Sequence, residues 1–316
     1  MSMARTNNGV ITACSHLYGW SAAHPAPEAL EEAKRVIAMK NPPRFSVVIP
    51  TLNQGDMIED TLLSLIHQDY PNLEIILVDG GSTDKTMAVV DQYRDHICAV
   101  VSEPDRGQSD AINKGFRLAS GDILCWLNSD DYFLPGALHH VADCFAADPK
   151  IRFAVGAGDV ISKDHHFLRH IPPLPMTEET MLNWKYDRWV MQQCCFWTRS
   201  LWQEAGGVDE QLHLLMDYDL WFRLSRISEA AMMKEKLAVM RYYPDAKTVK
   251  QNNKATEELA YVYAKNGAHQ ALREQVAELM ADRASTEAYL NRIHASLPVR
   301  LLKRLSAFPL QGQPGS

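Results

Sequence analysis

The sequence lacks any hydrophobic run long enough to cross a membrane. A spanning helix needs about 20 consecutive apolar residues, whereas the apolar runs near Cys98 and Cys125 are short and interrupted. Residues 1–8 contain one arginine with no apolar region behind it, unlike a secretory signal. We therefore expect a cytoplasmic protein with no membrane span.

Excess basic charge and paired cysteines are also missing. The chain has 32 Lys and Arg against 39 Asp and Glu, a formal net charge of −7. This balance argues against a sequence-independent nucleic-acid binder, which needs a broad basic surface, so we expect no nucleic-acid partner. The six cysteines form no CxxC pair, and four lie in apolar contexts typical of buried, reduced thiols.

What the sequence does contain is a regular alternation of strand and helix patterns from residue 45 onward. The strands, such as 73–78, are nearly continuous in apolar residues, as expected when helices cover both faces of a mostly parallel sheet. The predicted class is therefore α/β, with a Rossmann-like sheet. The expected strands are 45–49, 73–78, 97–101 and 122–127, and the expected helices are 57–68, 84–93, 108–119 and 135–147.

The patterns on either side predict a domain organisation in three parts. Residues 1–43 form an N-terminal extension with one amphipathic helix at 28–39, 44–250 the main domain, and 251–316 a helical C-terminal extension and tail. Residues 162–190 break the alternation and are expected to be a surface insertion. Their aromatic residues fit either stacking on an acceptor sugar or core packing: Trp184, Tyr186 and Trp189.

Polar residues follow each predicted strand, and in parallel sheets ligands bind beyond these carboxyl ends. Asp79 ends an apolar strand and precedes two glycines, so its carboxylate is placed to contact a ligand. The alternative is a turn aspartate that caps the next helix, a task that Asp84 already fits.

The next cluster is Asn128-Ser129-Asp130-Asp131, at the end of strand 122–127. Two adjacent carboxylates are costly unless a cation neutralises them, and hard oxygen ligands suit Mg²⁺ or Mn²⁺. A helix N-cap before Pro135 is the alternative. A divalent ion beside Arg106 and Lys114 is what a diphosphate needs.

These segments together resemble the family 2 glycosyltransferases of GT-A fold, from about Phe45 to Thr248. The order and spacing of the motifs agree over roughly two thirds of the chain. The matching segments are Ser46–Asn53, Val78–Thr86, Asp105–Gly107, Ala111–Gly115, Gly121-Asp122, Asn128–Asp131, Gly206–Glu210 and Met216–Trp221.

The resemblance implies a nucleoside diphosphate sugar donor, most simply a UDP-sugar. It places Pro50, Thr51 and Asn53 near the nucleoside, Asp79 at the base, and Arg106 at the diphosphate or sugar. Asn128 stands at the first position of the family's Asp-x-Asp motif, and we expect Asn128 and Ser129 to bind the nucleotide sugar. Binding of Mn²⁺ or Mg²⁺ is expected to depend on Asp130 and Asp131.

The resemblance also implies that Asp217 is the general base, with Met216 where related sequences often have glutamate. Asp219 cannot share a helix face with Asp217 and is expected to be structural. No histidine occurs in Arg241-Tyr242-Tyr243-Pro244, so we expect no third metal ligand there, and Lys247 is a candidate phosphate contact. Gln192-Gln193 fits a donor or acceptor contact and a strand-end amide equally well.

The predicted function is a metal-dependent inverting glycosyltransferase acting on a glycan or lipid-linked acceptor, in polysaccharide or glycoconjugate synthesis. One alternative is a sugar-phosphate nucleotidyltransferase, which needs a glycine-rich phosphate loop where this chain has Pro50–Asn53. The other is a non-catalytic nucleotide-sugar-binding protein, against which the retained Asp217 argues.

Two weaker patterns lie elsewhere. His165, His166 and His170 have a spacing seen at metal sites, but a solvated loop is the favoured interpretation. The basic amphipathic segment 297–305 fits a peripheral contact with the inner face of the membrane or a solvated helix end.

Overall fold

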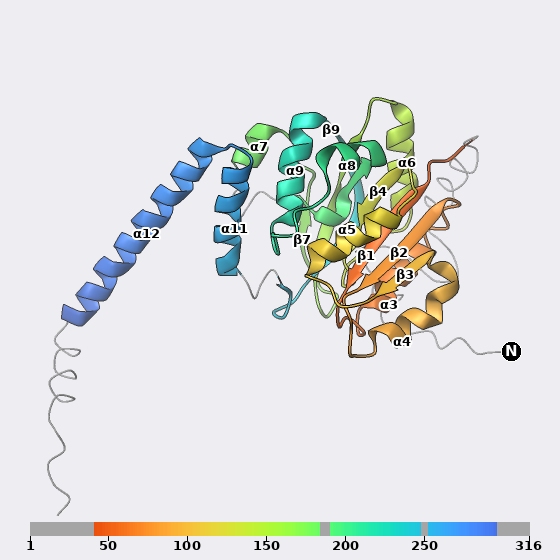
Figure 1. The fold of residues 1–316 in the computed structure, drawn as a ribbon, viewed down its shortest axis with the longest axis horizontal. Coiled ribbons are helices and arrows are strands. Elements are labelled where there is room, and N and C mark those ends of the chain that lie inside the picture. The colour runs from red at the N-terminus through yellow and green to blue at the C-terminus, as the bar shows by residue number, and fades with distance from the viewer. Residues whose placement is uncertain (1–40, 184–189, 248–251, 296–316) are drawn as a thin grey trace, which may run out of the picture. The chain divides into compact units, whose positions relative to one another are not determined.

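The computed structural model describes residues 41–183, 190–247 and 252–295 (Figure 1). The chain divides into two compact units near residue 259, and each is described separately here. Three predicted features lie outside the described residues: the helix at 28–39, the aromatic residues 184–189 and the basic segment 297–305. The predicted boundaries 44–250 and 251–316 stay predictions.

The first part of the main unit confirms the predicted alternation. Each predicted strand or helix is present with ends shifted by a few residues, and the helix expected at 84–93 is a short α-helix that continues as a 3-10 helix, Asp91–His96. The elements are β1 (Phe45–Thr51), α3 (Ile58–Ile66), β2 (Leu73–Asp79), α4 (Thr86–Val90), β3 (Ala99–Ser102), α5 (Gln108–Leu118), β4 (Ile123–Trp126), β5 (Tyr132–Phe133) and α6 (Ala137–Ala147).

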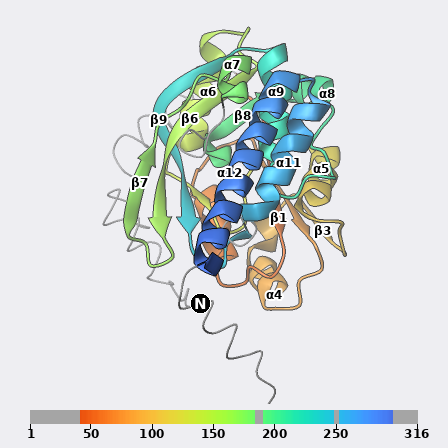
Figure 2. The same ribbon diagram turned by 90° about the vertical axis from the view of Figure 1, so that its left-hand side faces the viewer.

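The second part adds strands that the alternation did not predict. They are β6 (Phe153–Ser162), β7 (Phe167–Ile171), β8 (Cys195–Thr198) and β9 (Ala230–Tyr242), with α7 (Glu178–Leu182), a 3-10 turn (Gln192–Cys194), α8 (Arg199–Ala205) and α9 (Met216–Ile227) between them. The prediction of a surface insertion at 162–190 was therefore incomplete, because β7 joins the sheet by pairing antiparallel with β6 (Figure 2).

All these strands form one mixed sheet of nine strands, ordered β3-β2-β1-β4-β8-β6-β9-β5, with β7 paired to β6. The strands β3, β2, β1 and β4 are parallel, whereas β8 runs antiparallel to β4. The fold is α/β with helices on both faces, the GT-A arrangement. In the parallel half, the carboxyl ends of β1, β2 and β4 meet at one edge.

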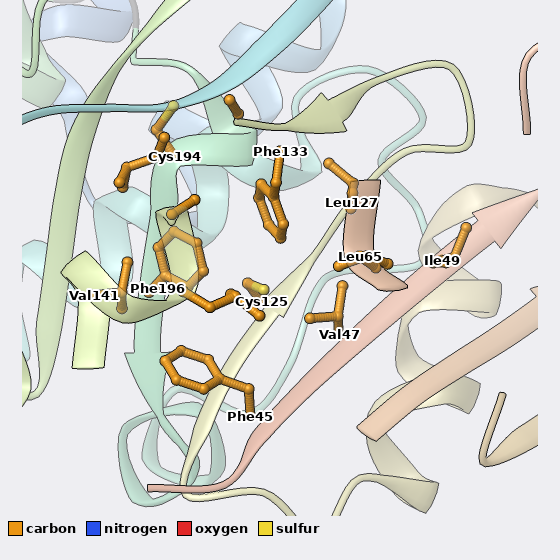
Figure 3. Packing of buried hydrophobic residues seen from close by; sticks show 14 of the residues in the cluster. Phe45, Val47, Ile49, Leu65, Cys125, Leu127, Phe133, Val141, Cys194 and Phe196 are labelled. Carbon is orange, nitrogen blue, oxygen red and sulfur yellow. The ribbon is translucent and has the colours of Figure 1, made fainter. Parts of the chain in front are cut away.

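Alternate residues of β1 pack on opposite faces of the sheet. Phe45, Val47 and Ile49 are fully buried in a core that includes residues of α3 and α6 (Figure 3). On the other face Val48 meets α5, which approaches closely because Gly115 has no side chain: a Cβ there would clash with Val48. The hydrophobic cluster that contains Phe45 therefore lies on the face covered by α3 and α6, and α5 packs closely on the opposite face.

Aromatic rings join α5, α8 and α9 to this second face. Trp126 of β4 stacks on Trp221 of α9 with ring centroids 5.8 Å apart. Phe116 of α5 lies 4.3 Å from Trp202 of α8. These contacts are buried and pack α9 against the sheet and α5 against α8.

The C-terminal part is helical, as predicted, with α11 (Asn252–Lys265) and α12 (His269–Ala295). The turn between them contains Gly267, whose φ of +69° is favourable for glycine. Within the described residues, no helix is both long enough and apolar enough to cross a membrane. The five cysteines of those residues are free thiols, and three of them are buried.

Candidate active site

The predicted nucleotide-binding residues lie on two interlocked loops after β1 and β2. In the parallel register Thr51 pairs with Asp79, so both strands end together. Asn53 has a φ of +52°; its amide oxygen accepts a hydrogen bond from the Thr83 N–H at 2.9 Å, and its own N–H donates to Ser82 Oγ at 2.7 Å. The structure therefore brings Thr51, Asn53 and Asp79 to one corner of the sheet edge.

Asp79 itself is fully buried and organises its own turn. Its carboxylate accepts hydrogen bonds from the N–H groups of Gly81 (3.3 Å) and Ser82 (3.1 Å) and from Ser102 Oγ (2.7 Å). Asp79 thus organises its turn but does not cap the next helix, where the Thr86 N–H donates to Asp84 at 2.9 Å, and contact of Asp79 with a base stays a prediction. Pro50 is buried in β1, and the buried Thr51 hydroxyl has no hydrogen-bond partner within the part of the chain described.

The acidic loop after β4 is held by a network of amide and carboxylate groups. Asp131 is 2% exposed and accepts hydrogen bonds from the Arg241 N–H (3.1 Å), the Asn128 amide (3.3 Å) and the Gln193 amide. Burial, together with the charge of the neighbouring Asp130, raises the pKa of the Asp131 carboxyl to about 8. This raised pKa means that the hydrogen bonds to Asp131 do not fully compensate for the burial of its charged form.

The Asp130 carboxylate has different hydrogen-bond partners from the Asp131 carboxylate. Its Oδ2 accepts a hydrogen bond from the Tyr243 hydroxyl at 2.7 Å, and its backbone oxygen accepts one from Arg241 at 3.1 Å. Arg241 is buried, forms an ion pair with Asp60 and lies over the Tyr132 ring at 5.1 Å. The segment 241–244, which contains no histidine, thus contacts the acidic loop through Arg241 and Tyr243.

Asp217 is the second residue of α9, where the helix N-terminus favours a negative charge. Its Oδ1 accepts a hydrogen bond from the Tyr218 N–H at 2.7 Å. Burial raises the pKa of Asp217 to about 6; the positive charge of Lys247 opposes this rise, and the negative charge of Glu258 adds to it. A carboxylate with this pKa is ionised at neutral pH and basic enough to accept a proton.

Lys247 connects Asp217 to the acidic loop. Its ammonium donates to Gln108 Oε1 at 3.0 Å, and the Gln108 amide donates to Asn128 Oδ1 at 2.8 Å. Burial lowers the pKa of Lys247, although the charges of Glu258 and Asp217 oppose the change. Lys247 is therefore hydrogen-bonded to the acidic loop through Gln108 and interacts electrostatically with the candidate base.

Two other predicted residues have clear structural partners. Asp219 is fully buried and paired with Arg223, at 3.0 Å to Nε and 2.8 Å to Nη2, which confirms its structural role. Arg106 is 74% exposed and pairs with Asp110 at 3.2 Å and Glu210 at 2.5 Å. Its proposed contact with a diphosphate stays a prediction, as does that of the buried Ser129.

His170 lies in strand β7 rather than in a loop. Its Nδ1 lies 2.7 Å from the buried Asp159 carboxylate, which also pairs with Lys236 at 2.9 Å. Among residues 41–183, 190–247 and 252–295, no group of three or more His, Cys, Asp or Glu is arranged to hold a metal ion. A metal at the acidic loop would therefore take further ligands from a diphosphate or water.

Several residues of the network were not predicted from sequence. Gln108, Tyr243 and Glu258 contact segments that are distant in the chain, so no local motif marks them. The only signals were indirect: Tyr243 lies in the segment noted for its missing histidine, and Gln108 begins a predicted helix.

Comparison with known sequences identifies the family. The model of the family described as "Glycosyl transferase family 2" matches residues 46–204, slightly more than half of the chain. The chain belongs to glycosyltransferase family 2. The match covers both loops of the predicted nucleotide site and the acidic loop but ends before Asp217, so the roles of Asp217 and Lys247 stay predictions.

Known sequence relatives of this family 2 glycosyltransferase are also named glycosyltransferases. An uncharacterised glycosyltransferase of Rickettsia typhi is 28% identical over 79% of each chain. A second, from Rickettsia prowazekii, is 29% identical over 64% of each chain. Three further Rickettsia glycosyltransferases are longer, and the match spans 30% to 36% of their length.

Two solved structures share the fold at low sequence identity. S. aureus TarS residues 1–349 in complex with UDP-GlcNAc has a TM-score of 0.57 at 18% identity and covers 74% of this chain and 71% of its own. The mannosyltransferase PcManGT from Pyrobaculum calidifontis, in complex with GDP-Man and Mn²⁺, has a TM-score of 0.55 at 18% identity and covers 94% of both chains. At this identity the likeness establishes the fold alone.

Proposed function

We propose that this chain is a metal-dependent inverting glycosyltransferase that moves a sugar from a nucleoside diphosphate sugar to a hydroxyl acceptor. The proposal is supported chiefly by the environment of Asp217, which lies at the start of α9 with its pKa raised to about 6, and which interacts electrostatically with Lys247, itself hydrogen-bonded through Gln108 to the acidic loop. A base and a cation-binding loop at one sheet edge are what this reaction requires.

In the proposed reaction, the acceptor oxygen attacks the anomeric carbon opposite the diphosphate. The new bond to the acceptor oxygen forms as the bond from the anomeric carbon to the diphosphate oxygen breaks, and the configuration at that carbon inverts. Asp217 takes the proton of the acceptor hydroxyl. The Lys247 ammonium, near Asp217 and hydrogen-bonded to Gln108, is placed to contact the departing phosphate.

The acidic loop fits a divalent cation, because it holds two adjacent carboxylates and the pKa of one is raised to about 8. Hard oxygen ligands of this kind suit Mn²⁺ or Mg²⁺. Asp130 would be the principal ligand, with Asp131 behind it fixing the loop through Gln193 and Arg241. When bound, the cation would stabilise the negative charge on the diphosphate.

The donor would lie across the two loops after β1 and β2. Pro50, Thr51, Asn53 and Asp79, which the strand register and the loop hydrogen bonds bring to one corner of the sheet edge, are assigned to the nucleoside. Arg106, Asn128 and Ser129 are assigned to the diphosphate and sugar. Two neighbours of the same fold bind UDP-GlcNAc and GDP-Man, and a UDP-sugar is our first candidate.

The acceptor would be a glycan or a lipid-linked hydroxyl compound, as in polysaccharide or glycoconjugate synthesis. The nucleotidyltransferase alternative has lost its support, because the matched family is one of glycosyl transfer. A screen of UDP-sugars and GDP-mannose by thermal shift with Mn²⁺ tests the donor class, since a ligand that binds only the folded state raises the melting temperature. If no nucleotide sugar shifts it, the proposal fails.

The metal assignment predicts the behaviour of Asp130→Ala. We expect this change to remove the Mn²⁺-dependent part of nucleotide binding, about 2–5 kcal/mol for a close charge contact, as measured by calorimetry with UDP or GDP. Asp95→Ala, an exposed aspartate of the 3-10 helix Asp91–His96, is the matched control. Equal Mn²⁺-dependent affinity in wild type and Asp130→Ala would contradict the assignment.

A further inference from the structure

A glutamate of the C-terminal helix α11 anchors the loop that leads into the candidate base. Glu258 is only 6% exposed. Its Oε1 accepts a hydrogen bond from the His213 N–H at 2.9 Å, and its Oε2 accepts from Leu214 at 2.8 Å and Leu215 at 2.9 Å. One carboxylate thus satisfies three successive backbone donors.

These donors lie directly before α9. Leu215 is the N-cap residue of the helix and provides no side-chain cap, and Asp217 follows two residues later. The three N–H groups belong to the N-cap residue and the two residues before it, not to the first turn of the helix. Glu258 therefore fixes the backbone as it enters α9, and its negative charge lies near the positive end of the helix dipole.

The preceding part of the same loop is anchored by α5. Asn113 donates to the Val208 oxygen at 2.9 Å and accepts from its N–H at 3.1 Å, and the Ser109 hydroxyl donates to the Leu212 oxygen at 2.6 Å. The α5 anchors end at Leu212, and the Glu258 anchors begin at His213. Glu258 thus fixes the last turn of chain before Asp217.

Glu258 is also one of the charges around Asp217. The ammonium of Lys247 is the opposing charge, and the buried Cys195 thiol faces the same carboxylate from β8. The negative charge of Glu258 raises the pKa of Asp217. Glu258 therefore affects both the position of Asp217, through the backbone before α9, and the pKa of the Asp217 carboxyl.

We propose that Glu258 is a positioning residue for glycosyl transfer, holding the His213–Leu215 backbone so that Asp217 reaches the acceptor hydroxyl. The inference rests on the proposed function of Asp217. It assigns a positioning role to a residue of helix α11, which lies beyond the residues matched by the family model.

The test compares Glu258→Gln and Glu258→Ala with Glu257→Gln, an exposed glutamate on the same helix. We expect both Glu258 variants to exchange amide hydrogens faster in peptides covering 212–218. We expect kcat to fall by about 10- to 100-fold, the scale of a small misplacement of a reacting group, with little change in KM for the donor. The control should match wild type in both measurements.

The dependence of kcat on pH distinguishes the proposed role of Glu258 from a purely structural role. Loss of the Glu258 charge lowers the pKa of Asp217, so the acidic limb of kcat should move to lower pH in Glu258→Gln, whereas partial unfolding would only reduce the amplitude. Wild-type kcat and an unmoved limb in both Glu258 variants, or unchanged exchange, would overturn the inference. Failure of the proposed function is distinct, because the wild-type chain itself would then transfer no sugar.

Discussion

At the scale of single residues, the site depends on carboxylates placed in different environments. Asp219 is neutralised by Arg223, and Asp79 is occupied by its own turn. Asp217 is the carboxylate whose pKa burial raises to about 6, with Lys247 limiting the rise. The same residue type is therefore a structural anchor at two positions and a candidate proton acceptor at the third.

This environment predicts a pH dependence of transfer. Asp217 must be deprotonated to accept a proton, so kcat should fall as the pH drops through about 6. Lys247→Met removes the positive charge that lowers the pKa of Asp217, so the acidic limb should move to higher pH. The profile of kcat against pH measures both effects, with the exposed Lys150→Met as the control. A flat profile between pH 5 and 8 would contradict this account.

At the scale of elements, α5 is the helix that organises the site. Its first residue, Gln108, joins Lys247 to Asn128, and its next turns hold the loop before α9 through Ser109 and Asn113. The helix can do this only because it lies close against β1, where Gly115 faces Val48. The position of α5 against the sheet therefore sets the position of both halves of the site.

Gly115→Ala tests this packing. In an exposed helix interior, replacing glycine by alanine stabilises the helix by about 1 kcal/mol. Here the added methyl group would clash with Val48, so we expect destabilisation instead, by about 1–3 kcal/mol, the usual cost of overpacking. Denaturant unfolding measures whether the free energy of unfolding rises or falls. The comparison is Leu118→Ala, a change at a side chain that is 48% exposed on the same helix. A more stable Gly115→Ala protein would show that α5 is not held this closely.

At the scale of the whole molecule, the sequence predicts the parallel half of the sheet well and the remainder poorly. Strands such as 73–78 are recognisable alone, because burial on both faces makes them continuously apolar. The β7 strand is not, since four of its five residues are exposed and it is defined by pairing with β6. Pairing partners distant in the chain leave no local periodicity.

Contacts between segments distant in the chain also explain why only part of the candidate site could be predicted from the sequence. Asp79 and Asp130 follow recognisable strands, and the family resemblance identifies Asp217. The contacts of Glu258 with His213–Leu215 and of Tyr243 with Asp130 join segments that only the fold brings together. Motifs thus predict the chemical groups, whereas the groups that position them require the structure.

The central claim is that Asp217 is the general base of an inverting glycosyl transfer. The most direct test is the transfer rate of Asp217→Asn at saturating donor and acceptor, using the nucleotide sugar found by the thermal-shift screen. The amide keeps the shape of the side chain but cannot take the proton, so we predict a loss of about 10²- to 10⁴-fold in kcat with donor affinity unchanged. Transfer by Asp217→Asn at the wild-type rate would contradict the account.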